Sequence, residues 1–236
     1  MILGIYGFQD AGKTLLVENL VKKLVDKGYR VSSVKHTPHK KSMDSEGKDT
    51  WRHWRAGSDP VVFSSEIETS IIRHSKMQTL EIARLVQEFF APDILIIEGF
   101  KDGDFPKVAV GKVKPRKGTV LVNPTLPRLV RWVENEIAVE RVLAKLPELN
   151  CGKCGSDCRG LAKAVAAGKK KVDSCRELAD RRVEVLVGNK RLPMGRFASA
   201  VVEETVRGLL NSLRGNDPGK DVEIRLECRR RASKKR

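Results

Sequence analysis

The stretch that decides the fold of this chain is residues 2–14, ILGIYGFQDAGKT. It starts with an apolar run that predicts a buried strand, and apolar residues then recur at helical spacing from Lys13 to about Lys27. Between strand and helix, Gly7 to Thr14 fits the phosphate-loop pattern G-x-x-x-x-G-K-[ST]. The glycines let backbone N–H groups curl around phosphate oxygens at the positive N-terminus of the helix. The combination predicts a nucleotide site, with a chance motif on a structural turn as the alternative.

The loop and a second strand supply candidate catalytic and metal-binding side chains. Lys13 is expected to reach the β- and γ-phosphates, and the Thr14 hydroxyl to ligate Mg²⁺. Ligands of open α/β sheets bind at the carboxyl ends of the strands, and ILIIEG at 94–99 offers Glu98 at such an end. Glu98 is expected to hold Mg²⁺ through water or to orient an attacking water, unless it is a solvated loop carboxylate. Asp93, at the start of this strand, is interpreted as a structural cap.

Strand and helix patterns alternate along the rest of the first 148 residues. Strands are expected at 29–36, 60–65, 69–74, 94–99, 107–113 and 118–123, and helices at 79–90 and about 132–146. Short connections between them favour a parallel sheet with right-handed crossovers. The prediction is therefore an α/β fold of the P-loop NTPase type, a mostly parallel sheet with helices on both faces.

Composition limits the classes of partner and compartment. The 236 residues carry 46 Lys and Arg against 30 Asp and Glu, a net charge of +16, which favours anionic partners. Aromatic residues make up only 5%, so base-stacking platforms are sparse and nucleic acid is disfavoured as a partner. No apolar run approaches the roughly 18 residues of a membrane span, and the N-terminus lacks the basic region of a signal peptide. A cytoplasmic protein that does not cross a membrane is expected.

Residues 35–57 are rich in loop-forming and titratable residues. They contain three of the four histidines, together with several carboxylates and cations. Loops that carry such groups at a sheet edge are where substrates are commonly held. The spacing of these residues alone does not identify a metal.

The last third of the chain holds a cysteine cluster, C-x₂-C-x₃-C-x₁₆-C. Its members are Cys151, Cys154, Cys158 and Cys175, while Cys228 stands apart as a plain thiol. A [4Fe-4S] cluster needs four cysteine ligands, and the neighbouring glycines allow the backbone to wrap closely around it. A four-cysteine zinc site usually consists of two separated C-x-x-C pairs, which this pattern lacks. We predict a [4Fe-4S] cluster, with zinc or free thiols as alternatives.

These patterns divide the chain into four expected parts. Residues 1–148 form the nucleotide-binding domain, 149–182 the four-cysteine module, 183–227 a small β-α-β unit and 228–236 a basic tail. In the β-α-β unit, VEVLVGNKRLP is expected to form a strand, FASAVVEETVRGLLNSLRG a helix and VEIRLEC (222–228) a second strand.

Two resemblances add to this interpretation. The phosphate loop, VKHTPH, GKDTWRHWRAG and DILIIEGFKDGDFPKVAV together resemble the MobB family, molybdopterin-guanine dinucleotide biosynthesis protein B, over about residues 1–145. This resemblance implies a homodimeric, GTP-binding adapter with weak GTPase activity. Such an adapter assists the MobA nucleotidyltransferase in attaching GMP to molybdopterin, the pterin of molybdenum and tungsten cofactors. The cysteine segment resembles the small four-cysteine [4Fe-4S] domain of corrinoid and electron-transfer proteins.

Carried over to this sequence, the family resemblance implies a set of nucleotide- and pterin-binding residues. They are Gly7, Asp10, Ala11, Gly12, Lys13, Thr14, Leu15, His36, His39, Asp44, Asp49 and Lys101. The resemblance also implies Mg²⁺ at Thr14 and Glu98, and Lys107 matches a basic position of the family. Guanine rests on the resemblance alone, because Asn189-Lys190 is not followed by the aspartate of the N-K-x-D motif.

Two other functions remain compatible with the sequence. A kinase for a small molecule or a nucleotide, built on the same fold, would consume nucleotide in proportion to its acceptor. A non-enzymatic redox sensor would use the iron–sulfur module to gate nucleotide binding. Whether the protein is an enzyme therefore stays open.

Overall fold

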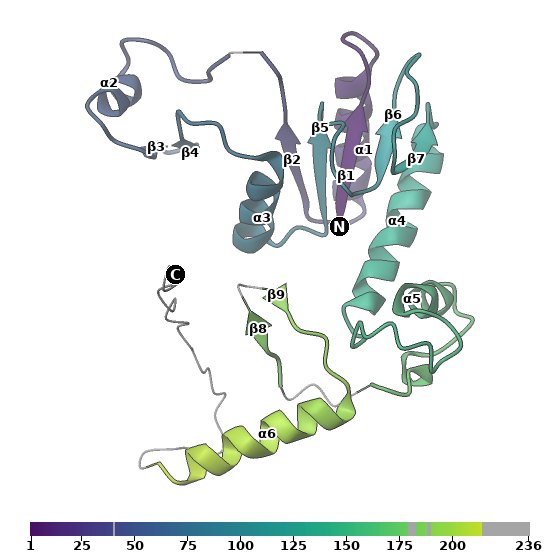
Figure 1. Cartoon of the computed structure of the whole chain (residues 1–236). Coiled ribbons are helices and arrows are strands. Elements are labelled where there is room, and N and C mark those ends of the chain that lie inside the picture. Colours follow the sequence, from purple (N-terminus) through teal and green to yellow (C-terminus); the bar gives the residue numbers. More distant parts are fainter. Residues whose placement is uncertain (40, 179–182, 188–189, 214–236) are drawn as a thin grey trace, which may run out of the picture. The chain divides into compact units, whose positions relative to one another are not determined.

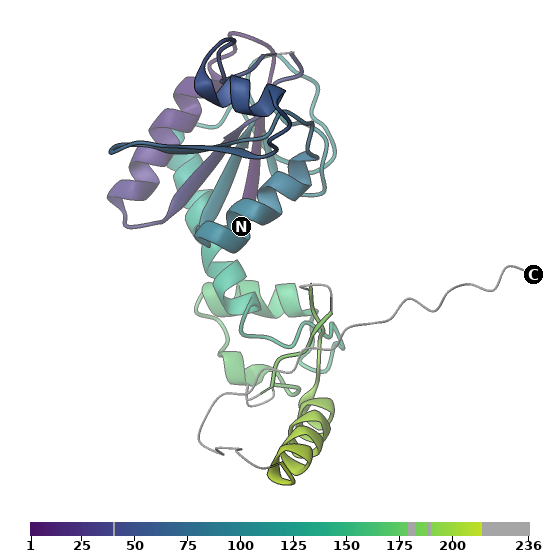
Figure 2. The same ribbon diagram turned by 90° about the vertical axis from the view of Figure 1, so that its left-hand side faces the viewer.

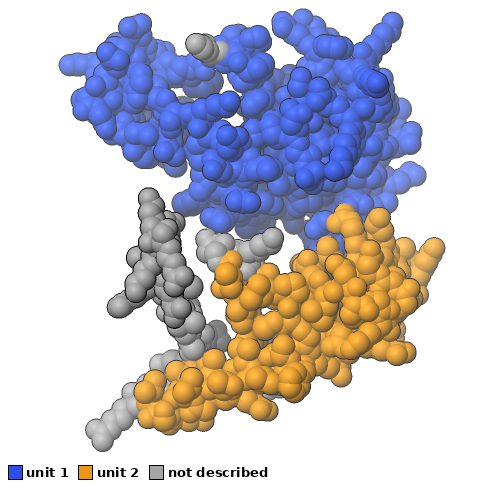
Figure 3. Space-filling view, in the orientation of Figure 1, with its two compact units in different colours: residues 1–142 blue, residues 143–236 orange. Residues whose placement is uncertain are grey.

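The computed structural model describes residues 1–39, 41–178, 183–187 and 190–213. The chain forms two compact units, residues 1–142 and 143–236 (Figure 3). The first unit ends a few residues before residue 148, where the change in composition places a boundary. The expected strand at 222–228, Cys228 and the tail at 228–236 lie outside the described residues.

A five-stranded parallel sheet forms the centre of the first unit. Its strands run in the order β2-β5-β1-β6-β7, side by side as Figure 1 shows. Their bounds are Val31–Lys35 (β2), Ile94–Glu98 (β5), Ile2–Tyr6 (β1), Lys107–Ala109 (β6) and Thr119–Val122 (β7). Every residue of β5 is buried, as expected for an apolar strand covered on both faces. The predicted parallel α/β fold is confirmed.

Helices cover both faces of this sheet. On one face, α1 (Lys13–Asp26) and α4 (Leu126–Leu143) pack buried leucines such as Leu20 and Leu129 against the strands. On the other face, α3 (Thr79–Phe90) contributes Ala83 to a second cluster, which Phe105 of the β5–β6 loop completes. Each face thus buries an apolar layer, the main stabilising contribution in a fold of this kind.

One segment of the first unit stands apart from the sheet. Helix α2 (Asp49–Arg55) precedes an antiparallel hairpin of β3 (Val61–Ser64) and β4 (Thr69–Ile72). Figures 1 and 2 show these elements beyond the β2 edge of the sheet. The sequence predicted the two strands but no helix at α2. The seven residues of α2 are too few for a clear helical pattern, with only Trp51 and Trp54 as nonpolar positions, and the stacking of Trp54 on His74 helps to stabilise the helix.

The second unit contains short elements joined by turns. Helix α5 (Cys158–Ala166) is followed by the 3₁₀ turn η1 (Val172–Ser174), an antiparallel pair of two-residue strands and a longer helix. The pair is β8 (Leu186–Val187) with β9 (Lys190–Arg191), and the helix is α6 (Arg196–Asn211). The single strand expected over VEVLVGNKRLP is therefore a hairpin. Within the described residues, no helix combines the length and apolarity that crossing a membrane requires.

Candidate phosphate-loop and cysteine sites

The phosphate loop lies between the end of β1 and the start of α1. A Cβ on Gly7 would approach the Val110 carbonyl oxygen to 2.3 Å, so this position requires glycine. Asp10 and Gly12 have φ angles of 58° and 83°, in the left-handed region. Helix α1 then begins at Lys13 without a side-chain hydrogen bond from its N-cap. The first-turn N–H groups are therefore not satisfied by a cap, as an anion site at a helix N-terminus requires.

Two side chains of the loop, those of Lys13 and Thr14, form hydrogen bonds. The Lys13 ammonium donates to the Phe8 carbonyl oxygen, which closes the loop on itself. The Thr14 hydroxyl donates to Glu98 Oε1 over 2.9 Å, although the two residues are far apart in sequence. This contact joins the loop to the carboxyl end of β5, as the sequence prediction of a shared metal site requires.

Glu98 lies at the point where β5 ends. Its side chain is only 8% exposed, and the same Oε1 also accepts a hydrogen bond from the Lys35 ammonium. The parallel register places Lys35, the last residue of β2, directly opposite Glu98. Gly99 follows with φ of 87°, where a Cβ would lie 2.3 Å from the His36 carbonyl oxygen. Lys35 belongs to the segment 35–57 that was expected to hold substrate groups, but nothing in the sequence pairs it with Glu98, because that position depends on the strand order.

The oxygen atoms at this edge suit Mg²⁺. A hydroxyl and a carboxylate are hard ligands, and Mg²⁺ is commonly held by one or two such groups, with phosphates and water completing its shell. Among the described residues, no group of three His, Cys, Asp or Glu side chains is arranged to hold a metal ion. Thr14 and Glu98 therefore fit a metal that is bound together with a nucleotide.

The remaining family-implied residues are dispersed. His36 is half-buried, with its ring edge-on to Phe100 at 5.3 Å between centroids and its Nδ1 3.4 Å from Thr79 Oγ1. His39, Asp49 and Lys101 have exposed side chains.

Asp44 is the centre of a separate cluster beside α2. Its side chain is 3% exposed, accepts a hydrogen bond from Thr50 over 2.7 Å and lies 3.0 Å from His74 Nε2. The His74 ring stacks on Trp54 with centroids 4.0 Å apart. The Thr50 hydrogen bond, followed by contacts with His74 and the Ser45 N–H, holds the pKa of Asp44 below its usual range. Here the structure gives Asp44 a role in holding α2 in place.

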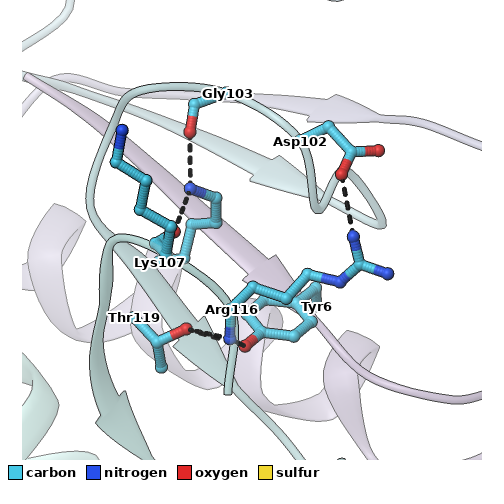
Figure 4. A network of polar contacts seen from close by, with 7 residues as sticks. Tyr6, Asp102, Gly103, Lys107, Arg116 and Thr119 are labelled. Carbon is cyan, nitrogen blue, oxygen red and sulfur yellow. Dashed lines mark hydrogen bonds and ion pairs between the residues drawn. The ribbon is translucent and has the colours of Figure 1, made fainter. Parts of the chain in front are cut away.

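Lys107, which matches a basic position of the family, is buried in the structure. It is 2% exposed, and its ammonium donates to the carbonyl oxygens of Gly103, Phe105 and Lys117 at 2.5, 3.3 and 2.9 Å. Figure 4 shows the ammonium turned into the loop that contains Gly103. All three donor positions of the ammonium are thus used within the chain. Lys107 joins the β5–β6 loop to the β6–β7 loop.

A second set of contacts in Figure 4 joins the same two loops. The Tyr6 hydroxyl lies 2.7 Å from Thr119 Oγ1 and accepts from the Arg116 N–H over 2.9 Å. The Arg116 guanidinium donates to Asp102 over 2.9 Å. Because Tyr6 is the last residue of β1, this network also fixes the strand end from which the phosphate loop departs.

The cysteine segment is shaped by residues with left-handed backbone. Glu148, Asn150, Gly152 and Gly155 all have positive φ angles. Asn150 contacts the start of α5 twice: its N–H donates to Cys158 Sγ over 3.4 Å, and its Oδ1 accepts from the Cys158 N–H over 3.1 Å. This pair of hydrogen bonds holds the turn that carries Cys151 and Cys154 against the helix that carries Cys158.

The four cysteine thiols differ in their exposure to solvent. Cys158 and Cys175 are buried, Cys154 is half-buried and Cys151 is exposed, and none forms a disulfide. Burial raises the pKa of the Cys175 thiol; a hydrogen bond from the Glu177 backbone opposes this shift, and the charges of Cys154, Cys158 and Cys151 add to it. The spacing of the four cysteines suits a thiolate-bound metal or cluster, but among the described residues no three of these thiols are arranged to hold a metal ion.

A parallel sheet whose first strand leads through G-x-x-x-x-G-K-T into a helix defines the P-loop class of α/β proteins. The family model described as MobB, "Molybdopterin guanine dinucleotide synthesis protein B", matches residues 2–132, more than half of the 236 residues. The chain belongs to the MobB family. A second family model, described as "Putative Fe-S cluster", matches residues 146–177, so both resemblances are confirmed.

Individual relatives agree with this family. The chain is 27% identical over 236 residues to a "Putative molybdopterin-guanine dinucleotide biosynthesis adapter protein" of Methanocaldococcus jannaschii, covering 96% of this chain and 97% of the relative. It is 34% identical over 118 residues to the adapter protein of Haemophilus influenzae, covering 49% of this chain and 66% of the relative. The crystal structure of Bacillus subtilis MobB matches 57% of this chain and 96% of its own, with 23% identity and a TM-score of 0.46.

Proposed function

We propose that this protein is a GTP-binding adapter in molybdopterin guanine dinucleotide biosynthesis, with weak GTPase activity. The observation that carries the proposal is the contact between Thr14 of the phosphate loop and Glu98 at the end of β5. The relatives named above are adapter proteins of this pathway. An adapter acts on a partner enzyme, and the partner proposed here is a MobA-type nucleotidyltransferase.

The chain's own residues would act mainly by electrostatics. Lys13 and the first-turn N–H groups of α1 would neutralise and orient the phosphates, for which Lys13 must exchange its contact with the Phe8 carbonyl oxygen. Thr14 and Glu98 would hold Mg²⁺, which supplies positive charge for the β- and γ-phosphates when bound. His36, His39, Asp49 and Lys101 are the proposed contacts for the pterin or the rest of the nucleotide, and the active form is proposed to be a homodimer.

The first test is GTP binding by the Lys13→Ala variant. Removal of the phosphate-binding ammonium should weaken the affinity for GTP·Mg²⁺ at least tenfold, about 1.4 kcal/mol, by isothermal titration calorimetry. The control is Lys27→Ala, which removes a lysine whose partner Glu134 lies 2.8 Å away on α4. Unchanged affinity in Lys13→Ala would contradict the assignment of this loop. The same titration with ATP decides between guanine and adenine.

The second test concerns the adapter role. GTP hydrolysis by the protein alone should be slow, and the addition of the transferase should change either GTP hydrolysis or transfer of GMP to the pterin. Consumption of nucleotide in proportion to a small-molecule acceptor, without any partner protein, would instead identify a kinase.

We propose further that residues 149–182 form a module that binds a [4Fe-4S] cluster through Cys151, Cys154, Cys158 and Cys175. The "Putative Fe-S cluster" match and the spacing C-x₂-C-x₃-C-x₁₆-C support this assignment. The measurement is iron, acid-labile sulfide and zinc per chain after purification without oxygen. About four irons and four sulfides per chain are expected. One zinc without sulfide would make the segment a structural zinc site.

A further inference from the structure

The phosphate-loop site contains a cation that neither the motif nor the family resemblance assigns. Lys35 ends β2 directly opposite Glu98 in the parallel register. Its ammonium donates to Glu98 Oε1, the same oxygen that accepts from Thr14 Oγ1 over 2.9 Å. The carboxylate oxygen best placed for a metal shared with Thr14 is therefore already bound by a positive charge of the chain.

The two partners of this ion pair differ in exposure. The Lys35 side chain is 60% exposed, whereas the Glu98 side chain is 8% exposed and anchored at a strand end. A carboxylate withdrawn from water requires a positive or hydrogen-bonding partner. The lysine stem is flexible and its ammonium is well hydrated, so it can leave at small cost. Glu98 is thus the fixed partner and Lys35 the movable one.

We infer that Lys35 is the positioning residue that occupies the cation position of Glu98 until nucleotide binds, and that it must release this carboxylate before Glu98 can ligate a divalent metal ion. The inference rests on the proposed function, because it takes Glu98 as a ligand of the metal–nucleotide complex. An ammonium and a divalent cation repel each other at one carboxylate oxygen. The phosphates of the nucleotide offer the released ammonium a new partner, so nucleotide and metal binding become coupled through Lys35.

The test is a titration of the full chain with Mn²⁺, followed by the electron paramagnetic resonance signal of free Mn²⁺, with and without GTP. Without GTP, Lys35→Met should bind Mn²⁺ about threefold to tenfold tighter than the wild type, because the competing charge is gone. GTP should then raise the Mn²⁺ affinity less than it does in the wild type. Lys35→Arg keeps the charge and should restore the behaviour of the wild type.

Two further variants test whether a change in Mn²⁺ affinity arises from the Lys35–Glu98 pair. Lys27→Met changes the net charge equally at the exposed pair with Glu134 and should leave Mn²⁺ binding unchanged. Glu98→Gln should remove the Mn²⁺ binding that Lys35→Met strengthens. Equal Mn²⁺ affinities of Lys35→Met and the wild type in both titrations would overturn the inference while GTP binding stands. A protein that binds no GTP under any condition would overturn the proposed function, and the titration without GTP would still measure the competition at Glu98.

Discussion

The two units of this chain position their functional side chains by different means. In the first unit, Thr14, Lys35 and Glu98 lie at the ends of regular elements, and the parallel register brings them together. In the second unit, the cysteines lie on turns with left-handed residues and at the start of a short helix. A sheet edge of this kind is built without its ligand, whereas thiols on turns gain much of their order from what they bind.

The largest expected effect is on the stability of the first unit, which in this comparison is ordered by its own contacts without a ligand. Lys107→Met should lower the free energy of unfolding by about 3 kcal/mol, because one buried and two partly buried carbonyl oxygens lose their donor at once. The measurement is urea unfolding followed by the fluorescence of the tryptophans, all of which lie in the first unit.

The matched control for this variant is Lys117→Met. The Lys117 side chain is 96% exposed and its ammonium lies 3.8 Å from Asp104, so its loss should change stability by less than about 0.5 kcal/mol. A similarly small change in Lys107→Met would mean that the cost of burying the ammonium cancels its three hydrogen bonds. The two loops would then be held by the Tyr6 and Arg116 contacts alone.

The positions of most helices and strands of the first unit could be predicted from the sequence, because local residue patterns determine them. Helix α3 spans 79–90 as predicted, because its apolar spacing gives its extent, a capping box of Gln78 and Glu81 fixes its start, and it ends at Ala91 with a left-handed backbone. Helix α4 starts at Leu126, earlier than the predicted 132, because Pro127 lies in the first turn, where its missing N–H costs nothing. Local pattern does not reveal which sheet a strand joins, and β3 and β4 form a hairpin of their own.

The candidate sites were predictable to a lesser extent. The phosphate loop and Glu98 follow from a motif and a strand end, and the structure adds a hydrogen bond between Thr14 and Glu98. The pairing of Lys35 with Glu98 and the burial of Lys107 depend on strand order and on loops that cover the sheet. A single sequence predicts neither the pairing of Lys35 nor the burial of Lys107. A lysine at the end of an apolar strand has the same local pattern whether its side chain is exposed or buried.

The next effect concerns the turn of the cysteine segment. Asn150→Ala removes the side-chain acceptor of the Cys158 N–H. It also places alanine at a φ of 49°, in the left-handed region that asparagine tolerates better than alanine does. The cluster-free segment should lose about 2 kcal/mol of local stability, seen as roughly thirtyfold faster amide hydrogen exchange in α5. Exchange in α1 of the same sample is the internal reference.

A second substitution separates the two contributions at Asn150. Asn150→Gly also loses the hydrogen bond but tolerates the left-handed backbone, so its effect should be about half that of Asn150→Ala. Unchanged exchange in both variants would show that the turn is held by other contacts. The claim that the Asn150 hydrogen bonds order this segment would then be wrong.

The smallest effect is a pH dependence within the first unit. Burial acts to raise the pKa of Asp93, but hydrogen bonds from the Arg141 guanidinium at 2.8 Å and the Arg30 N–H at 2.9 Å outweigh it and lower the pKa. A carboxyl whose pKa is lower in the folded than in the unfolded protein stabilises the fold above about pH 4, the unfolded value. This stabilisation is lost as the pH falls through the folded value.

Asp93→Asn should therefore cost about 1 kcal/mol at pH 7, and the variant and wild type should converge below about pH 3. Urea unfolding at the two pH values measures both differences. The control is Asp102→Asn, whose side chain is 69% exposed beside Arg116 and should contribute little at either pH. A difference that persists undiminished in acid would assign the role of Asp93 to hydrogen bonds that a neutral carboxyl can also accept. The first unit would then depend on backbone and apolar contacts at this corner of the sheet, rather than on charge.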